Sequence, residues 1–180
     1  MIYLFLADGF EECEALVPLD ILRRGKIKVQ TVGISSKNIT GAHGITVIAD
    51  ILEKDAVFDN LKGIILPGGM PGTVNLENSA TVNEFIDFAN KNNLLIAAIC
   101  AAPSILGHKG LLKNKKATCF TGFEKDLIGA NVVDAPLVKD GNVITAFGAG
   151  AAFPFGFEIL KALTGEDFCK NLSKQMRYIK

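Results

Sequence analysis

A cysteine ends an apolar run in the middle of the chain. The six residues 94–99 before Cys100 are all apolar, which is the length expected of a strand buried on both faces. Pro103 suits the first turn of a helix, where proline's missing N–H costs nothing. Cys100 is therefore predicted to lie on a sharp strand-to-helix turn. Helix N–H groups there favour a reactive thiolate with a lowered pKa; a cysteine that only packs is the alternative.

Glu14 is a second candidate because it interrupts an apolar helical stripe. The stripe continues at helical spacing through Val17, Pro18, Ile21 and Leu22. The carboxyl group of Glu14 is therefore expected to face the core, where burial favours its protonated form. A carboxylate that caps a loop N–H is the alternative. The neighbouring Glu11 and Glu12 are expected to be solvated acids of the first helical turn.

A glycine-rich turn, residues 67–72, follows another short buried strand. It lacks the Gly-Lys-Ser/Thr of a phosphate loop and does not match a dinucleotide-binding fingerprint. Gly68 and Gly69 permit close backbone approach with free N–H groups, although a tight structural turn is the simpler interpretation. If this turn meets Cys100 and Glu14, its N–H groups can hold an oxyanion on a substrate or on an oxidised sulfur.

Composition argues against several other classes of protein. The 180 residues suffice for one domain, predicted to span 1–180, and the zero net charge argues against nucleic acid and acidic membranes as partners. The apolar start, residues 1–7, is too short for a signal peptide or a membrane span. Four scattered cysteines and two histidines do not form a zinc pattern, so no metal is expected. Free thiols fit a reduced, cytoplasmic compartment.

The candidate residues lie where predicted strands end. Strands are predicted at residues 2–6, 28–33, 63–66, 94–99 and 117–120, and hairpins within 38–49 and 137–144. Helices are predicted at residues 11–24, 79–91, 103–106 and 166–176, with another that follows Gly150 and ends near 164, and a helical turn at 123–128. This alternation predicts an α/β fold, a doubly wound, mostly parallel sheet with helices on both faces. In such sheets the ligand site lies beyond the carboxyl ends of the strands.

These motifs, in this order, resemble the ThiJ/PfpI superfamily, and within it the branch of the parkinsonism-associated protein deglycase. The resemblance spans nearly the whole chain and rests on residues 7–14 (ADGFEECE), 17–20 (VPLD), 66–69 (LPGG) and 96–101 (IAAICA). It implies a flavodoxin-like α/β/α sandwich, usually a homodimer, with no cofactor. By this resemblance Cys100 is the nucleophile and Glu14 its protonated partner. The N–H groups of Gly69 and Ala101 would form the oxyanion pocket.

The chain departs from the superfamily's patterns at several positions. Ala101 stands where the protease and glyoxalase branches carry His, which argues against a Cys–His protease. Phe120 takes a position that is often His, and residues 147–150 (FGAG) replace a frequent Arg-Gly-Pro-Gly. His43 lies on a hairpin loop where relatives often carry Arg, and in a dimer that loop can approach the partner's pocket. His43 and Gly68 are therefore additional candidates around the site.

Two functions from different classes follow from these residues. In the first, Cys100 attacks small reactive aldehydes or glycated adducts, as a cofactor-independent glyoxalase or protein deglycase in stress protection. In the second, the protein is a redox sensor with little turnover, and Cys100 is oxidised to a sulfinate. An inert α/β domain, in which Cys100 only packs, is the remaining alternative.

Overall fold

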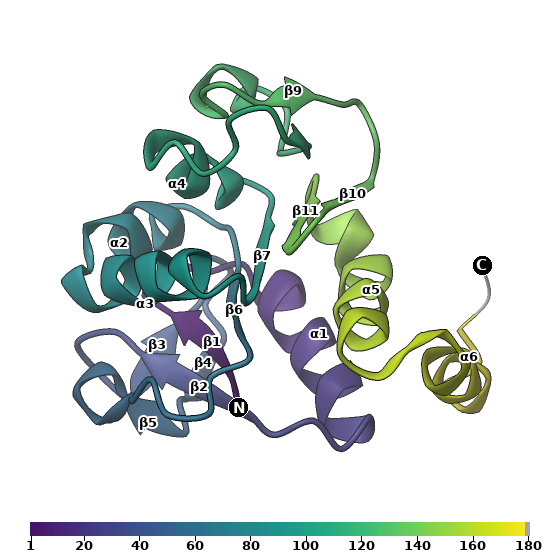
Figure 1. Cartoon of the computed structure of the whole chain (residues 1–180). Coiled ribbons are helices and arrows are strands. Elements are labelled where there is room, and N and C mark those ends of the chain that lie inside the picture. The colour runs from purple at the N-terminus through teal and green to yellow at the C-terminus, as the bar shows by residue number, and fades with distance from the viewer. Residues whose placement is uncertain (179–180) are drawn as a thin grey trace.

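A seven-stranded sheet forms the centre of the computed structural model, which describes residues 1–178 (Figure 1). Its strands are β1 (Ile2–Leu6), β2 (Val29–Gly33), β5 (Ile51–Leu52), β6 (Gly63–Leu66), β7 (Leu95–Ile99), β10 (Leu137–Asp140) and β11 (Val143–Ala146). Their spatial order is β10-β11-β7-β6-β1-β2-β5, and every neighbouring pair is parallel except β10 with β11. The predicted doubly wound, mostly parallel sheet is confirmed.

Helices cover both faces of this sheet (Figure 1). One face packs against α1 (Glu12–Arg24) and α5 (Ala152–Thr164), with α6 (Glu166–Gln175) beside α5. The other face packs against α2 (Gly72–Asn78), α3 (Ala80–Lys91) and α4 (Pro103–His108). Each face has its own core of fully buried side chains, because strands covered on both sides carry apolar residues at successive positions. The α/β/α sandwich is therefore confirmed.

Smaller elements lie outside the central sheet. The predicted hairpin within 38–49 forms a separate two-stranded sheet from β3 (Asn38–Thr40) and β4 (Thr46–Ile48). The short strands β8 (Lys116–Ala117) and β9 (Asn131–Val132) pair in another. Single 3-10 turns occur at η1 (Glu53–Asp55), η2 (Glu124–Asp126) and η3 (Ala149–Ala151), and η2 confirms the predicted helical turn. No helix within residues 1–178 is long and apolar enough to cross a lipid bilayer.

The strand predicted at 117–120 is wrong beyond Ala117. The N–H of Thr118 donates to Thr145 Oγ1 (3.0 Å), and the N–H of Phe120 donates to the carbonyl of Cys100 (2.8 Å). These bonds tie the segment to the ends of β11 and β7, so it does not continue a ladder with β9. Helix α2 was not predicted. The consequence for function is that residues 118–120 lie beside the cysteine turn.

The strand order places the predicted site at a switch point. After β1 the chain forms β2 and β5 on one side of it, and it then returns to form β6 on the other side. The segments after β1, β6 and β7 therefore leave the same carboxyl edge of adjacent strands. These are the segments that carry Glu14, the two glycines and Cys100.

Candidate active site

Cys100 occupies the predicted sharp turn between β7 and α4. Its backbone has a φ of +65°, a left-handed conformation that few non-glycine residues adopt. The N–H of Cys100 still donates to the carbonyl of Ala146 on β11 (2.9 Å), so the sheet holds the residue in place. Pro103 then begins α4. The turn directs the cysteine side chain out of the strand, as at a nucleophile elbow.

Glu14 reaches this cysteine from the first turn of α1. Glu11 caps that helix, and its Oε2 accepts a hydrogen bond from the N–H of Glu14 (2.7 Å). The Glu14 side chain is buried, as its position in the apolar stripe predicts, with 1% of the residue exposed. Its Oε2 accepts the N–H of Gly68 (2.9 Å), and the carboxyl group is also hydrogen-bonded to the Cys100 side chain. Both interpretations of Glu14, as partner of the cysteine and as a group that binds a loop N–H, are therefore present together.

The two glycines allow the three segments to meet. A Cβ added at Gly68 would lie 2.6 Å from Cys100 Cβ and 2.6 Å from Glu14 Oε2, so a side chain has no space there. Gly69 has a φ of +89°, and a Cβ there would lie 2.4 Å from the backbone nitrogen of Glu11. Glycine is required at both positions for close approach. The N–H groups of Gly69 and Ala101 are hydrogen-bonded to the Cys100 sulfur.

The acid–base properties of the pair differ partly from the prediction. Burial raises the pKa of Glu14 to about 7, and its hydrogen bonds to Cys100 and Gly68 oppose that rise. Burial also raises the pKa of the Cys100 thiol to about 12, and the negative charge of Glu14 adds to the rise. The N–H groups of Gly69 and Ala101 lower the thiol pKa, but by less. The expectation of a lowered thiol pKa was therefore wrong.

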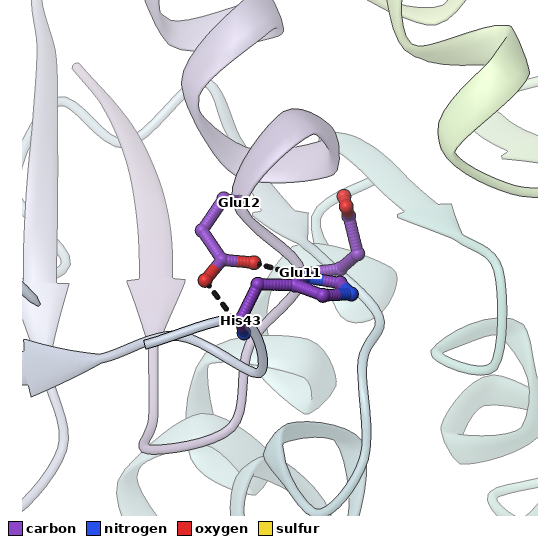
Figure 2. Close-up of side chains that lie close together, drawn as sticks. All are labelled: Glu11, Glu12 and His43. Atoms are coloured by element: carbon purple, nitrogen blue, oxygen red, sulfur yellow. Dashed lines mark hydrogen bonds and ion pairs between the residues drawn. The ribbon is translucent and has the colours of Figure 1, made fainter. Parts of the chain in front are cut away.

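The expectation that Glu12 is a solvated acid was also wrong. Only 5% of the residue is exposed, and the β3–β4 hairpin covers it. Its Oε1 accepts the N–H of His43 (2.8 Å) and of Ile45 (3.4 Å), and its Oε2 lies 2.7 Å from His43 Nδ1 (Figure 2). Burial acts to raise the pKa of Glu12, but the bonds to the His43 ring and to these N–H groups outweigh it, and the pKa is lowered. Glu12 therefore fixes the hairpin to the start of α1.

His43 lies on this hairpin and not beside Cys100. Its side chain is 69% exposed and is paired with Glu12, which raises the pKa of the imidazole. Glu11, Glu12 and His43 could each offer one ligand atom to a metal ion, and these atoms lie within 4.8 Å of one another. However, Glu11 caps α1 and Glu12 binds the hairpin, so local structure already accounts for this group.

A cavity of about 640 Å³ adjoins the site and was not predicted. Its walls come from two segments after α4 and from the turn after β11: Thr118, Cys119, Phe120, Thr121, Glu124, Val132, Val133, Asp134, Phe147, Gly148, Ala149 and Gly150. Phe120 connects it to the cysteine turn, because the Phe120 N–H donates to the Cys100 carbonyl. The unusual residues 120 and 147 were the only signal in the sequence for this cavity.

Comparisons with known proteins agree with this arrangement. A sequence model described as the DJ-1/PfpI family matches residues 1–162. Protein DJ-1alpha of Drosophila melanogaster is 33% identical over 177 residues, covering 96% of this chain and 82% of that protein. Glutathione-independent glyoxalase DJR-1.2 of Caenorhabditis elegans is 32% identical over 167 residues, covering 92% of this chain and 89% of that protein. The crystal structure of a DJ-1 superfamily protein from Salmonella typhimurium superposes with a TM-score of 0.94 and 34% identity, covering 99% and 98% of the two chains.

Proposed function

Because the chain belongs to the DJ-1/PfpI family, we propose that it converts small reactive carbonyl compounds in a cofactor-independent reaction at Cys100. The observation that carries the proposal is the contact between the buried Glu14 carboxyl and the Cys100 side chain, at a sulfur that also receives two backbone N–H groups. One relative is named a glutathione-independent glyoxalase, which favours a 2-oxoaldehyde as the substrate.

The position of one proton decides whether the sulfur reacts. Glu14 and Cys100 are hydrogen-bonded, so between their two pKa values the pair shares one acidic proton. In the reactive form Glu14 holds this proton and the sulfur is a thiolate. A neutral Glu14 no longer opposes the thiolate charge, and the N–H groups of Gly69 and Ala101 stabilise it. A carboxylic acid thus activates the cysteine, and no histidine is needed.

The reaction with methylglyoxal then proceeds in balanced steps. The thiolate attacks the aldehyde carbon, and the oxyanion that forms takes the proton from Glu14 to give a hemithioacetal. Glu14, now ionised, removes the C1 hydrogen as a proton and returns it to C2, while the hydroxyl proton passes from O1 to O2, which converts the adduct into a lactoyl thioester. Water hydrolyses the thioester to lactate and frees the thiol, so the net reaction consumes one methylglyoxal and one water. The Gly69 and Ala101 N–H groups, which favour negative charge on the sulfur, would also stabilise the oxyanions.

Lactate formation from methylglyoxal tests the proposal. Cys100→Ser should abolish measurable turnover, because a serine hydroxyl beside Glu14 is a far weaker nucleophile. Cys13→Ser is the matched control, since Cys13 is exposed on α1 and lies outside the site, and it should keep the wild-type rate. Equal rates in wild type and Cys100→Ser would refute the proposal. Early adducts of methylglyoxal on N-acetylcysteine, assayed with the same variants, test the deglycase form of the reaction.

The same pocket supports a redox role as the second candidate. Two molecules of peroxide would convert the thiolate to a sulfinate and release two waters. The sulfinate oxygens would accept hydrogen bonds from the Gly69 and Ala101 N–H groups and from protonated Glu14. Mass spectrometry after mild peroxide treatment should find Cys100 oxidised before the other cysteines. Earlier oxidation of the exposed Cys13 would contradict a sensing role.

We also propose that the protein is a homodimer. The β3–β4 hairpin carries two apolar side chains that are unusually exposed in the single chain, Ile45 at 54% and Ile48 at 76%. Exposed apolar residues that cluster on one element are typical of protein interfaces. Size-exclusion chromatography with light scattering should give twice the chain mass of 19.2 kDa. A mass of one chain at micromolar concentration would contradict the proposal.

A further inference from the structure

The cavity beside the cysteine turn points to a preference among carbonyl substrates. We propose that it binds the substituent attached to the reacting carbonyl, and that it selects neutral compounds with an aromatic group over anionic ones. This inference rests on the proposed function and specifies the substrate class of the same site. The cavity's volume of about 640 Å³ lies within the range of small-molecule sites in proteins.

The cavity is connected to the reacting groups through two of its lining residues. Phe120 donates its N–H to the carbonyl of Cys100 at 2.8 Å, so the backbone of this lining residue is bonded to the cysteine turn. A Cβ added at Gly148 would lie 3.2 Å from the Phe120 ring and 4.0 Å from Glu14 Oε1. Gly148 therefore separates the aromatic wall from the carboxyl group by little more than its own backbone. A carbonyl compound bound at Cys100 and Glu14 therefore has this wall within reach of its substituent.

The wall offers apolar surface that is open to a ligand. Phe120 is 50% exposed, Phe147 is 38% exposed and Val132 is 44% exposed. Three partly exposed apolar side chains around one cavity are available for contact with an aromatic ring, which gains from both burial and ring–ring geometry. A methyl substituent would contact little of this surface, whereas a phenyl group would contact much more.

The charge of the lining opposes anionic substrates. Glu124 and Asp134 line the cavity, and none of the lining residues is Lys, Arg or His. A carboxylate or phosphate on the substrate would therefore meet like charge and no cation. The glycines and alanine of residues 148–150 add no charge. The cavity consequently fits a neutral substituent.

Alkylation of Cys100 tests the cavity without requiring turnover. Rates for iodoacetamide, N-benzyl iodoacetamide and iodoacetate are measured at the Cys100 peptide by mass spectrometry, each divided by its rate with free glutathione. We expect the benzyl reagent to exceed iodoacetamide by about tenfold, and iodoacetate to be the slowest. Equal normalised rates for the three reagents would overturn the proposal.

Two sets of variants assign these preferences to the lining. Phe120→Ala should reduce the benzyl advantage several-fold, and Phe168→Ala is the matched control, because Phe168 is similarly exposed (45%) but lies on α6 outside the cavity. The double variant Glu124→Gln with Asp134→Asn should raise the iodoacetate rate relative to iodoacetamide. The same loss in both phenylalanine variants, or an unchanged iodoacetate ratio, would refute the assignment.

Turnover measurements then separate this proposal from the proposed function. Wild-type kcat/KM should favour phenylglyoxal over methylglyoxal, and Phe120→Ala should reverse most of that preference. If the alkylation preferences hold but neither aldehyde is converted, the cavity proposal stands and the glyoxalase function fails. If methylglyoxal is converted but the aromatic aldehyde and reagent show no advantage, the glyoxalase function stands and the cavity proposal is refuted.

Discussion

Two acids on the same helical turn, Glu12 and Glu14, are almost equally shielded from solvent, yet their pKa values move in opposite directions. Glu12 is 5% exposed and its pKa is lowered, whereas Glu14 is 1% exposed and its pKa is raised to about 7. Burial acts to raise the pKa of both carboxyl groups. Glu14 lies deeper in the protein than Glu12, so burial acts on it more strongly, and the two carboxyl groups also differ in what they contact.

The number and type of hydrogen-bond donors add to this difference. Glu12 receives two backbone N–H groups and the ring of His43, which itself can carry a positive charge. Glu14 receives one backbone N–H, from Gly68, and faces a thiol. A carboxylate with several donors stays ionised even when buried, while one with few donors keeps its proton. The first turn of α1 thus holds a carboxyl group with a lowered pKa and, two residues later, one with a raised pKa.

Glu14→Gln should produce the largest effect, because it removes the acid but keeps the shape. We expect kcat for methylglyoxal to fall by about 100-fold or more, the usual contribution of a general acid–base group. Glu12→Gln should retain most of the wild-type kcat, because Glu12 does not contact Cys100 and glutamine still offers an oxygen to the His43 N–H. Parallel lactate assays on the two variants measure this contrast. Similar losses at both positions would show that the two acids do not have separate roles.

The raised pKa of Glu14 also predicts how stability depends on pH. In the unfolded chain this carboxyl ionises near 4.5, but in the folded protein it keeps its proton to about 7. The folded state binds more protons within this window, so stability falls as pH rises through it, by about 3 kcal/mol. Glu14→Gln should lack this fall. Urea denaturation of both proteins across the window measures it, and parallel pH profiles would contradict the assigned pKa.

Removing the Glu12 carboxylate should destabilise the protein more than it impairs the chemistry. Glu12→Ala leaves the N–H groups of His43 and Ile45 without their acceptor, at a cost of about 1–3 kcal/mol. In a chain of this size that corresponds to a fall in Tm of about 2–4 °C per kcal/mol. Glu77→Ala is the matched control, since Glu77 also pairs with a histidine, His108, on a half-exposed surface. Among the bonds described for its carboxylate, none comes from a backbone N–H. An equal fall in Tm for the two variants would refute the structural role of Glu12.

Much of the fold could be predicted because its signals are local. The central strands are continuous apolar runs, and the fully buried β7 is an example. Helix α2 was missed because it has seven residues and one of its two large apolar side chains, Val74, is 40% exposed, so no amphipathic period develops. The strand predicted at 117–120 was wrong because this segment is hydrogen-bonded to the Thr145 side chain and the Cys100 carbonyl and does not continue a ladder with a neighbouring strand. Both partners are distant in the sequence.

The two reacting side chains of the candidate site could be predicted because each breaks a pattern in the sequence. Glu14 was found because an acid interrupts an apolar stripe, and Cys100 because it ends a buried strand. The role of Glu12 was missed because its partners include backbone N–H groups 31 and 33 positions away, which leave no mark in the sequence. The predicted direction of the thiol pKa shift was wrong because the burial of Cys100 depends on how several segments pack around it. The cavity was missed for the same reason, because its walls come from segments that are far apart in the sequence.

His43→Gln should give the smallest effect, and its pH dependence tests whether Glu12 is ionised. Pairing with Glu12 raises the pKa of His43, so this stabilisation is full below about 6.5, the unfolded value, and is lost as pH rises through the folded pKa. The lowered pKa of Glu12 means that its share is present above about 4.5 and is lost as pH falls through the folded value. The difference in Tm between wild type and His43→Gln should therefore be largest between these limits and shrink at higher pH. High salt should reduce it, because the ring is 69% exposed. If the difference in Tm instead grows with pH, Glu12 keeps its proton at low pH and has a raised pKa, as Glu14 does.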